Sequence, residues 1–394
     1  MKLLVLGGDG FCGWPTSLHL SARGHDVAIV DNFARRAVDE ELGVSSLTPI
    51  RPLHERLDAW EEVSGRRISH FNLDLTRDYE ALRRLLVDYE PDAIAHFAQQ
   101  PSAPYSMKTP AHKRRTVEGN LSSTHNLLCA LVENGQDIPL VHLGTMGVYG
   151  YSGAWPIPEG YLKVEMPTQG GVMKPREILY PTDPGSIYHM TKSIDQLLFY
   201  YYNKNDGLRI TDLHQGIVWG TNTVETSLDE RLINRFSYDG EFGTVLNRFL
   251  IQAAVGYPLS VHGVGGQTRA FIHLQDTVRC IELALINPPG AERVRIFNQV
   301  SETYRVSELA QTVAKLTGAE VQFVANPRNE TPVTEMKVDM VGLKSLGFTP
   351  TSFADGLMTE VIEVARRYAH RCDQSKFPAV IPWRAERTSQ DAAE

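Results

Sequence analysis

No apolar run in the sequence approaches the ~18 residues that a membrane span requires, so a membrane protein is not expected. Cysteine is scarce, and the 394 residues include only Cys12, Cys129, Cys280 and Cys372. These positions lack the spacing of metal ligands, and reduced thiols in a cytoplasmic protein without a metal site fit them best. No signal peptide is expected, because an apolar strand begins at Lys2 and runs directly into a glycine-rich turn.

An excess of positive charge is also absent. The chain has 39 lysines and arginines against 47 aspartates and glutamates, which gives a formal net charge of −8. Nucleic acid and anionic membrane surfaces are therefore not expected as partners, and an anionic substrate would need arginines placed locally. With 42% apolar and 22% charged residues, the composition is that of an ordinary globular protein. The length allows one large two-part domain or two modest ones.

The first thirty residues predict a strand, a glycine-rich turn, a helix and a second strand. Lys2–Leu6 is a short apolar run typical of a buried parallel strand, Pro15–Ala22 is a predicted helix, and a second apolar run at 27–30 ends at Asp31. The glycines of the turn are Gly7, Gly10 and Gly13. Such a turn lets the backbone approach a pyrophosphate and aims a helix N-terminus at it, while the carboxylate binds an adenosine ribose diol.

Asp31 also bears on which dinucleotide binds. Its carboxylate would repel a 2′-phosphate, so the sequence favours NAD over NADP. Arg35 and Arg36 argue the other way, although a solvated basic pair after a strand is the commoner meaning of such residues. We therefore predict NAD as the cofactor.

Strands and helices alternate along most of the chain. Apolar runs predict strands at 71–75, 93–98, 139–144, 209–213 and 263–272. Helical periodicity predicts helices at 79–88, 120–134, 188–203, 247–255, 276–285, 306–316 and 353–368. This order predicts an α/β fold with a doubly wound parallel (Rossmann) sheet over 1–215 and a smaller α/β substrate-binding domain, mainly 216–384. About 262–285 is expected to return to the first domain, and the polar tail 385–394 to be disordered.

Three segments lack a clear pattern. Residues 37–70 are polar and charged and are predicted to be an insertion in which Trp60 and Val63 mark a helix. Residues 151–185 are rich in glycine and proline, and so long an irregular stretch indicates a functional loop or lid. Residues 221–246 lie where a substrate-specific cap would sit. His96, inside a predicted strand, is interpreted as an interior histidine rather than a ligand.

Tyr188 and Lys192 are four residues apart in a run with apolar residues at helical spacing, so they should share one helix face. A phenol ordinarily keeps its proton up to a pKa of about 10, and a neighbouring ammonium favours the phenolate and lowers that pKa. Thr145, at the end of the strand at 139–144, adds a hydroxyl for the same substrate oxygen. Together these groups would take a proton from a sugar hydroxyl while a hydride leaves the carbon beneath it.

Seven short motifs carry a resemblance to a known family. They are GGDGFCGW at 7–14, SLTPI at 46–50, SAPYSM at 102–107, LGTMG at 143–147, YHMTK at 188–192, FGTVLNRF at 242–249 and GGQTR at 265–269. Through them the chain, from its first residue to about Trp383, resembles the extended short-chain dehydrogenase/reductase family of nucleotide-sugar enzymes. The glycine turn and the Tyr/Lys pair are shared by every extended member. SAPYSM and GTMG are more specific, and resemble the members that build a sugar sulfonate.

The resemblance implies a reaction of UDP-glucose with sulfite that puts a sulfonate on C6 of the glucose, giving the head-group donor of a sulfolipid. Bound NAD⁺ would oxidise C4 with Tyr188 as base, the ketone would acidify the C5 proton, and loss of the C6 hydroxyl would give an enone. Sulfite would add at C6 and hydride would return to C4, so that NAD is recycled. Members of the class commonly form homodimers through the helices equivalent to 120–134 and 188–203.

The residue pattern and the resemblance together assign side chains to three roles. The predicted catalytic residues are Thr145, Tyr188, His189 and Lys192. The predicted cofactor-binding residues are Gly7, Gly10, Phe11, Cys12, Gly13, Asp31, Asn32, Arg36, Asp74, Leu75, Phe97, Ala98, Tyr188, Lys192 and Gln215. The predicted substrate-binding residues are Gln100, Ser102, Thr145, Gln215, Thr244, Asn247, Arg248, Gln267, Arg269 and Arg328. Of these, Arg269 and Arg328 are expected to hold the UDP diphosphate and ribose.

One departure from the wider class is informative. Sugar-nucleotide 4,6-dehydratases follow the equivalent of Thr145 with an Asp-Glu pair, the acid and base of their elimination, whereas this chain has Met146 and Gly147. Plant members have a Glu where this chain has Val148 and an Arg where it has Pro101, so neither is essential if the activity is the same. The acid and base for C5 and C6 thus stay unassigned. The nearest candidates for sulfite or proton handling are Gln100, Ser102 and His189, the last about 100° around the helix from Tyr188.

Two other functions remain open at this stage. A UDP-glucose 4-epimerase would use the same Thr145, Tyr188 and Lys192 and would need neither sulfite nor an elimination base. A nucleotide-binding scaffold that acts through partner binding alone is disfavoured by the intact catalytic residues. The sequence also leaves open whether sulfite enters from solution or from a sulfite-delivering partner protein.

Overall fold

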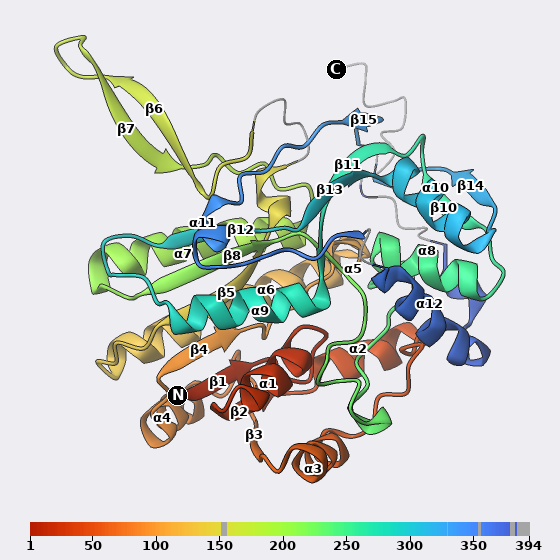
Figure 1. Ribbon diagram of the computed structural model, residues 1–394. Helices are drawn as coiled ribbons and strands as arrows, with labels where there is room; N and C mark the ends of the chain where they lie inside the picture. The colour runs from red at the N-terminus through yellow and green to blue at the C-terminus, as the bar shows by residue number, and fades with distance from the viewer. Residues whose placement is uncertain (151–155, 329, 354–355, 379–382, 384–394) are drawn as a thin grey trace.

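A seven-stranded sheet is the centre of the fold (Figure 1). The computed structural model describes residues 1–150, 156–328, 330–353, 356–378 and 383. The strands of this sheet are β1 (Lys2–Leu6), β2 (Asp26–Asp31), β3 (Ile68–Asn72), β4 (Ala93–His96), β5 (Leu140–Thr145), β8 (Ile210–Gln215) and β12 (Arg295–Gln299). They pair in the order β12-β8-β5-β4-β1-β2-β3, and every pair is parallel. The predicted doubly wound parallel sheet is confirmed.

Helices cover both faces of this sheet, which explains why its central strands are apolar throughout. In β1, Leu3 and Val5 pack into one hydrophobic cluster and Leu4 and Leu6 into another, and none is more than 1% exposed. The first cluster includes side chains of α1 (Gly13–Ala22), α3 (Leu53–Ser64) and α9 (Leu274–Ile286). The second includes side chains of α4 (Tyr79–Tyr89), α6 (Pro110–Glu133) and α7 (Ile187–Asp206). Within the described ranges, no helix has both the length and the apolarity needed to cross a membrane.

Two predicted elements have other bounds in the structure. The helix predicted at 120–134 is α6, which begins ten residues earlier, at Pro110. The strand predicted at 71–75 is β3, which ends at Asn72 because the chain then turns around Asp74, whose carboxylate accepts the backbone N–H of Thr76 at 2.9 Å. The start of α6 is mostly exposed, and the apolar pattern is weak there, whereas Leu75 is buried although the strand has already ended.

Residues 37–70 were predicted to be an insertion in which Trp60 and Val63 mark a helix, and that helix is present as part of α3 (Leu53–Ser64). They contain most of α2 (Ala34–Leu42), all of α3 and the start of β3. Helix α3 buries Leu53, Arg56, Ala59 and Trp60 at helical spacing, and the indole N–H of Trp60 donates to Ser21 Oγ of α1 at 3.0 Å. The segment is therefore part of the main core.

A second, smaller hydrophobic core lies in the C-terminal half. One sheet contains β9 (Ile217–Trp219), β11 (Gly266–His273), β13 (Glu302–Arg305) and β15 (Val333–Thr334), and β10 (Leu259–His262) pairs with β14 (Val321–Val324). The helices α8 (Val245–Ala254), α10 (Val306–Thr317) and α12 (Leu357–Arg367) pack around it. Figure 1 shows this half beside the carboxyl end of the large sheet.

The chain passes between the two halves more than once. Of the segment 262–285, expected to return to the first domain, β11 belongs to the smaller sheet and α9 packs on the large one. The edge strand β12 also lies in the large sheet. A hydrogen bond also joins the two halves. The indole N–H of Trp14 in α1 donates to the carbonyl of Leu232 at 2.8 Å, which ties residues 221–244 to the helix that follows the glycine turn.

Residues 156–185 form a hairpin rather than an irregular loop. The antiparallel strands β6 (Tyr161–Pro167) and β7 (Met173–Leu179) pair over their whole length and extend from the body of the protein (Figure 1). No residue of 156–185 lines the main cavity described below, so this part gives no support to the prediction of a functional loop or lid, and 151–155 lie outside the described residues. Most side chains of the hairpin are exposed on both faces, so the sequence lacks the alternation that would have revealed it.

A buried histidine ties the two halves together. His19 of α1 bonds through Nδ1 to Glu225 at 2.8 Å and through Nε2 to Glu282 of α9 at 2.9 Å. Burial alone would lower its pKa, but the hydrogen bonds and charges of the two carboxylates outweigh burial and raise the pKa to about 9. The imidazole is thus protonated at neutral pH.

We expect the stability of the protein to fall as the pH rises through 9. Because the pKa of His19 is higher in the folded than in the unfolded chain, its contribution is complete below the unfolded pKa of about 6.5 and is lost as the pH rises through about 9. The shift corresponds to a contribution on the order of 3 kcal/mol. Urea unfolding between these pH values should show the loss in the wild type, and a much flatter profile in His19→Gln. The exposed His370→Gln is the control, and a wild-type slope in His19→Gln would refute the assignment.

Candidate active site

One large cavity, of about 580 Å³, lies between the carboxyl end of the large sheet and the C-terminal half. Every residue predicted to bind cofactor or substrate or to act in catalysis lines it, with the single exception of Arg36. Residues of the glycine turn lie at one part of the lining, and Arg269 and Arg328 of the C-terminal half at another. The structure therefore brings the predicted site together, as expected for an open α/β sheet. Lining the cavity does not establish the role of each side chain.

The glycine turn has the shape that a dinucleotide pyrophosphate needs. Gly7 has φ +85°, and a Cβ there would lie 2.7 Å from the carbonyl carbon of Phe97. A Cβ on Gly13, the first residue of α1, would lie 2.1 Å from the carbonyl oxygen of Gly7. Only glycine fits at these positions, so the backbone is bare where the N-terminus of the ten-residue helix α1 meets the cavity.

Asp31 is held at the end of β2 in the position expected for a ribose-binding carboxylate. Its two oxygens accept the backbone N–H groups of Asp9 at 2.8 Å and Phe33 at 2.7 Å. Each oxygen keeps a second lone pair for a hydroxyl group of a ligand. Burial raises the pKa of Asp31, although these two hydrogen bonds oppose the rise.

Arg35 and Arg36 are not the solvated pair that the sequence indicated. Arg36 donates to the carboxylate of Asp9 at 2.6 and 2.9 Å and does not line the cavity. The guanidinium of Arg35 lies 3.7 Å from the ring centre of Phe242 and pairs with Asp39. The predicted cofactor contact of Arg36 is therefore not supported, because its guanidinium pairs with Asp9 outside the cavity lining.

Asp9, inside the glycine turn, was missed as a structural residue. It is 2% exposed and also accepts from the buried Arg56 at 2.8 Å, while Arg235 lies 3.9 Å away. Arg56 in turn lies 3.9 Å above the ring of Trp14. These contacts join α2, α3 and residue 235 beneath the turn, and fix its shape. The signal available in the sequence was the acidic residue among the glycines.

Tyr188 and Lys192 lie in the first two turns of α7, as predicted. The helix begins at Ile187, where the side chain of Ser186 accepts the backbone N–H of His189 at 3.2 Å. Lys192 Nζ lies 5.9 Å from the ring centre of Tyr188. Burial lowers the pKa of Lys192 to about 8, and the carboxylates of Asp195 and Asp212 oppose this. At neutral pH the ammonium form therefore prevails, and its charge faces the phenol.

Thr145 ends strand β5 beside this helix. Its Oγ1 accepts the backbone N–H of Gly147 at 3.1 Å, so that the hydroxyl proton is left for another acceptor. Since Thr145 also lines the cavity, a substrate oxygen is a fitting acceptor. Cys12 lines the cavity too, but burial raises the pKa of its thiol to about 12, which excludes a thiolate nucleophile at neutral pH.

His189 is buried next to Tyr188 and against Gly147. The ring centres of Tyr188 and His189 are 5.3 Å apart, and a Cβ on Gly147 would lie 2.3 Å from the imidazole Cδ2 of His189. Burial, followed by the charges of Arg328 and Arg269, lowers the pKa of His189 to about 3. The imidazole is therefore neutral, and it fills the space that a longer side chain at 147 would need.

Arginines are concentrated at the other end of the cavity. Arg269 pairs with Glu330, and the guanidinium of Arg328 lies 4.8 Å from the ring centre of Trp383. Arg248 donates to the carbonyl of Phe377 at 2.6 Å, and burial lowers its pKa to about 10. These are the locally placed cations that a chain of net charge −8 needs for an anionic ligand.

Gln100 and Ser102 have structural contacts of their own. Gln100 Nε2 donates to the carbonyl of Ser102 and to Thr116 Oγ1, both at 3.0 Å. Ser102 Oγ donates to the carbonyl of Glu241 at 2.6 Å and accepts the N–H of Tyr105 at 3.0 Å. Because these donors are engaged within the protein, the structure gives little support for sulfite binding by the two side chains.

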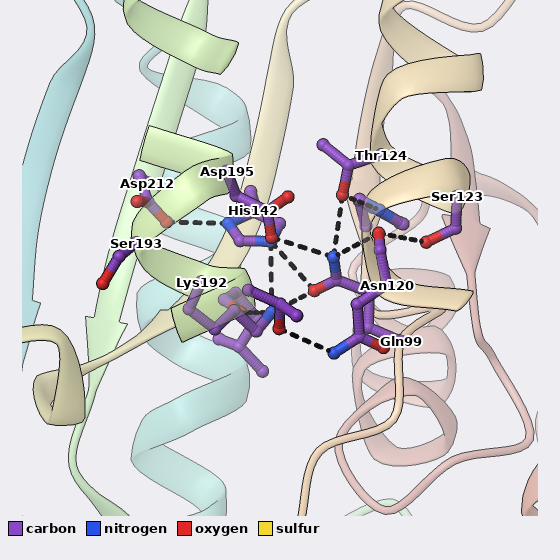
Figure 2. Close-up of polar contacts among 12 residues, drawn as sticks. Gln99, Asn120, Ser123, Thr124, His142, Lys192, Ser193, Asp195 and Asp212 are labelled. Carbon is purple, nitrogen blue, oxygen red and sulfur yellow. Dashed lines mark hydrogen bonds and ion pairs between the residues drawn. The ribbon is translucent and has the colours of Figure 1, made fainter. Parts of the chain in front are cut away.

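A buried polar network behind Lys192 was not predicted (Figure 2). It joins Gln99, Asn120 and Thr124 to side chains of strands β5 and β8 and of helix α7. His142 of β5 lies opposite Asp212 of β8, and their side chains are 2.8 Å apart. The available signal was the presence of His142, Asp212 and His214 in runs otherwise predicted to be buried strands.

Comparison with known proteins agrees with this geometry. Residues 3–298 match the sequence pattern of the NAD dependent epimerase/dehydratase family. The chain is 40% identical to the chloroplastic UDP-sulfoquinovose synthase of Spinacia oleracea over 388 residues, which cover 97% of this chain and 79% of the relative. It is 39% identical to the UDP-sulfoquinovose synthase of Sulfolobus acidocaldarius, over 89% of this chain and 88% of that one.

Solved structures show the same fold. The UDP-glucose 4-epimerase of Stenotrophomonas maltophila, with bound NAD and formylated UDP-arabinopyranose, superposes with a TM-score of 0.70 at 21% identity, over 94% of this chain and 98% of that chain. The dTDP-glucose 4,6-dehydratase of Streptomyces venezuelae, with bound NAD, gives a TM-score of 0.68 at 22% identity, over 93% and 97% of the two chains. At this identity the likeness supports the fold alone.

Proposed function

The chain belongs to the NAD-dependent epimerase/dehydratase family and, within it, to the UDP-sulfoquinovose synthases; from this premise we propose that it converts UDP-glucose and sulfite to UDP-sulfoquinovose for sulfolipid synthesis. The observation that carries the proposal is the set of groups around Thr145. The oxidising residues Tyr188 and Lys192 are in place, whereas Met146 and Gly147 stand where a dehydratase has its carboxylates, and His189 fills the space beside them.

NAD fits the cavity through its bare glycine turn, the N-terminus of α1 and the oriented carboxylate of Asp31. NAD bound there would supply the acceptor for the hydride from C4 of the sugar and the donor that restores it. Tyr188 accepts the proton of the C4 hydroxyl, with the ammonium of Lys192 favouring the phenolate, and Thr145 donates a hydrogen bond to the same oxygen. When hydride returns, the proton goes back from Tyr188 to that oxygen.

Between these two steps the sugar loses water and gains sulfite. The C4 ketone makes the C5 proton acidic, and its loss with departure of the C6 hydroxyl as water leaves a C5–C6 double bond conjugated to the ketone. The sulfur of sulfite adds to C6 and a proton returns to C5. We propose His189 as the proton acceptor for C5. The positive charges of Arg269 and Arg328 contribute to its low pKa, and a bound diphosphate would offset them and raise its basicity.

The function is tested by incubating the purified protein with UDP-glucose, with and without sulfite, and measuring product masses. A sulfonated product that forms only with sulfite is expected. UDP-galactose formed in both reactions would indicate a 4-epimerase instead, and no product in either would favour the scaffold alternative. Sulfonation by the purified protein with free sulfite would also show that a sulfite-delivering partner is not required.

We expect Arg269→Ala to weaken binding of UDP by about 2 kcal/mol, roughly thirtyfold, because the diphosphate would lose a bidentate cation in a buried setting. Calorimetric titration with UDP measures the loss. Arg305→Ala is the matched control, since Arg305 lies on the neighbouring strand β13, opposite Thr268, and is outside the cavity lining. An unchanged affinity in Arg269→Ala would remove Arg269 from the proposed site.

We also propose that the protein is a homodimer that pairs through α6 and α7. Large apolar side chains of α7 are exposed in the single chain, with Leu197 61%, Tyr200 46% and Tyr201 58% accessible. The double variant Leu197→Glu/Tyr201→Glu should sediment as a monomer, because a dimer would bury both charges. Val224→Glu is the control, because Val224 is also an exposed apolar residue but lies outside α6 and α7. A wild type that sediments as a monomer would contradict the proposal.

A cytoplasmic location remains a prediction. It is based on the four cysteines, all of which are free thiols in the structure. The relative from Spinacia oleracea is chloroplastic, so the location of this protein has to be measured directly, by fractionation of the cells that produce it.

A further inference from the structure

The polar groups behind Lys192 form a connected chain through the interior of the large sheet (Figure 2). Lys192 Nζ lies 3.1 Å from Nε2 of His142, whose Nδ1 lies 2.8 Å from Oδ1 of Asp212. The other oxygen of Asp212 lies 3.0 Å from Nε2 of His214. None of these four side chains is more than 4% exposed. The chain is therefore buried within the sheet and meets the cavity at Lys192.

The strands are built to bring these groups together. His142 of β5 is in register with Asp212 of β8, and Gly144 of β5 with His214. A Cβ on Gly144 would lie 2.5 Å from Oδ1 of Asp212, so glycine at this position leaves room for the carboxylate between the two imidazoles. The glycine at 144 therefore makes room specifically for the carboxylate of Asp212.

The far end of the chain fixes where the hydrogens are. The amide nitrogen of Asn298 donates to backbone carbonyls, so its Oδ1 faces the hydroxyl of Tyr149, 3.0 Å away, and must accept from it. The oxygen of Tyr149 then accepts from Nδ1 of His214 at 2.7 Å and from the N–H of Gly160 at 3.0 Å. Nε2 of His214, 3.0 Å from Asp212 Oδ2, donates to that carboxylate oxygen.

The near end follows from this. Asp212 is a carboxylate, because its contacts with His214 and His142 outweigh its burial and keep its pKa well below the ordinary value. It accepts the Nδ1 hydrogen of His142, which leaves Nε2 of His142 with a lone pair. Lys192 can then donate to that lone pair, and its other hydrogens go to the carbonyl of Leu143, at 2.6 Å, and to Gln99.

We propose that His142 is a positioning residue for Lys192: Asp212 and His214 hold it in the tautomer that accepts from Lys192, and so keep the ammonium charged and aimed beneath Tyr188. The inference builds on the proposed function, in which that ammonium favours the Tyr188 phenolate. Other ionisable groups around His142 are Asp195 of α7, whose Oδ2 lies 3.5 Å from its Nε2, and His96 of β4, with ring centres 5.6 Å apart. Helix α6 contributes the uncharged Asn120, Ser123 and Thr124 to the network.

Asp212→Asn separates this role from simple packing. An asparagine keeps the volume of the aspartate but offers a single acceptor to two imidazoles that both need one. His142 then loses its Nδ1 partner or turns an Nε2 hydrogen toward Lys192, where two hydrogens would meet. In either case the charged form of Lys192 is disfavoured, and the phenolate of Tyr188 loses its counter-charge.

The test is the ionisation of Tyr188 in the NAD-loaded protein without substrate. It is measured as the near-ultraviolet absorbance of phenolate against pH, minus the same titration in a Tyr188→Phe background. We expect the midpoint to rise by about one unit or more, a tenfold change in the equilibrium, in Asp212→Asn and in His142→Leu. His142→Gln should keep the wild-type midpoint, because its amide can donate to Asp212 and accept from Lys192. His96→Gln is the control, because Nε2 of this buried histidine of β4 bonds to Thr124 Oγ1, at 3.2 Å, and not to Lys192.

Midpoints that stay at the wild-type value in both Asp212→Asn and His142→Leu would overturn the inference, as would an equal rise in His142→Gln and His142→Leu. Should Asp212→Asn fail to fold, the comparison of the two His142 variants decides alone. Because neither UDP-glucose nor sulfite enters the titration, its result is independent of the sulfonation assay. If the protein makes no sulfonate but its variants show the shifted Tyr188 midpoint, the proposed function is refuted and the inference stands.

Discussion

Tyr188→Phe should reduce formation of UDP-sulfoquinovose by about 10³-fold or more, because it removes the group proposed to accept the proton of the C4 hydroxyl, and positioned proton transfer contributes about 10²–10⁴-fold. Only one oxygen atom is lost, at the edge of the cavity, so the fold and the bound NAD should remain. Turnover is measured as the rate of sulfonated product at saturating UDP-glucose and sulfite. Tyr200→Phe, an exposed residue of the same helix, is the control and should keep full activity.

The same variant also tests the order of the chemistry. In deuterated water without sulfite, the wild type should introduce deuterium at C5 of UDP-glucose, because oxidation at C4 precedes loss of the C5 proton. Tyr188→Phe should block this exchange, since it blocks the oxidation. If Tyr188→Phe makes product at the wild-type rate, Tyr188 is not the base. If the wild type forms product while C5 shows no exchange, the C5 proton is shielded from solvent or is retained until sulfite is present.

Gly13→Ala should abolish the co-purification of NAD. The added Cβ would lie 2.1 Å from the carbonyl oxygen of Gly7, and since both atoms belong to backbone, the turn must deform where the pyrophosphate is expected. The ligand released on denaturation is identified and counted by mass spectrometry. The wild type should release NAD, and the finding of NADP would contradict the assignment of Asp31.

Two further glycine variants make this a graded test. A Cβ on Gly10 would lie 3.1 Å from the same oxygen, so Gly10→Ala should retain a fraction of the bound NAD. Gly170→Ala, in the hairpin turn with no atom within 4 Å of the added Cβ, should bind like the wild type. Full NAD content in Gly13→Ala, with the protein folded by circular dichroism, would show that the turn does not hold the cofactor.

The parallel sheet was predictable from the sequence because its strands are short apolar runs. Their tertiary packing agrees with the strand conformation that such runs favour. Leu3 to Leu6 of β1 are apolar at every position, which is possible only where helices cover both faces. The hairpin β6/β7 escaped prediction for the opposite reason. Most of its side chains are exposed on both faces, and the apolar pair that packs against the core, Tyr161 with Leu179, lies at its base.

Within the site, local spacing was predictable and long-range pairing was not. Tyr188 and Lys192 share one helix face, which their separation alone fixes. Arg36, by contrast, was expected to reach the cofactor and instead pairs with Asp9, 27 residues away. The contact of Lys192 with His142 likewise joins two elements, and only the register of β5 against β8 supplies Asp212 as the third member.

The close contact between His189 and Gly147 limits the order in which this site can change in evolution. The imidazole occupies the volume that any side chain at 147 would enter, with 2.3 Å between its Cδ2 and a Cβ there. A glutamate at 147, such as the dehydratases carry, is excluded while His189 keeps this rotamer. A new rotamer or a replacement of His189 therefore has to accompany any change at Gly147. The two positions are epistatic, and a route to a dehydratase has to clear the imidazole from this space before a glutamate at 147 is accommodated.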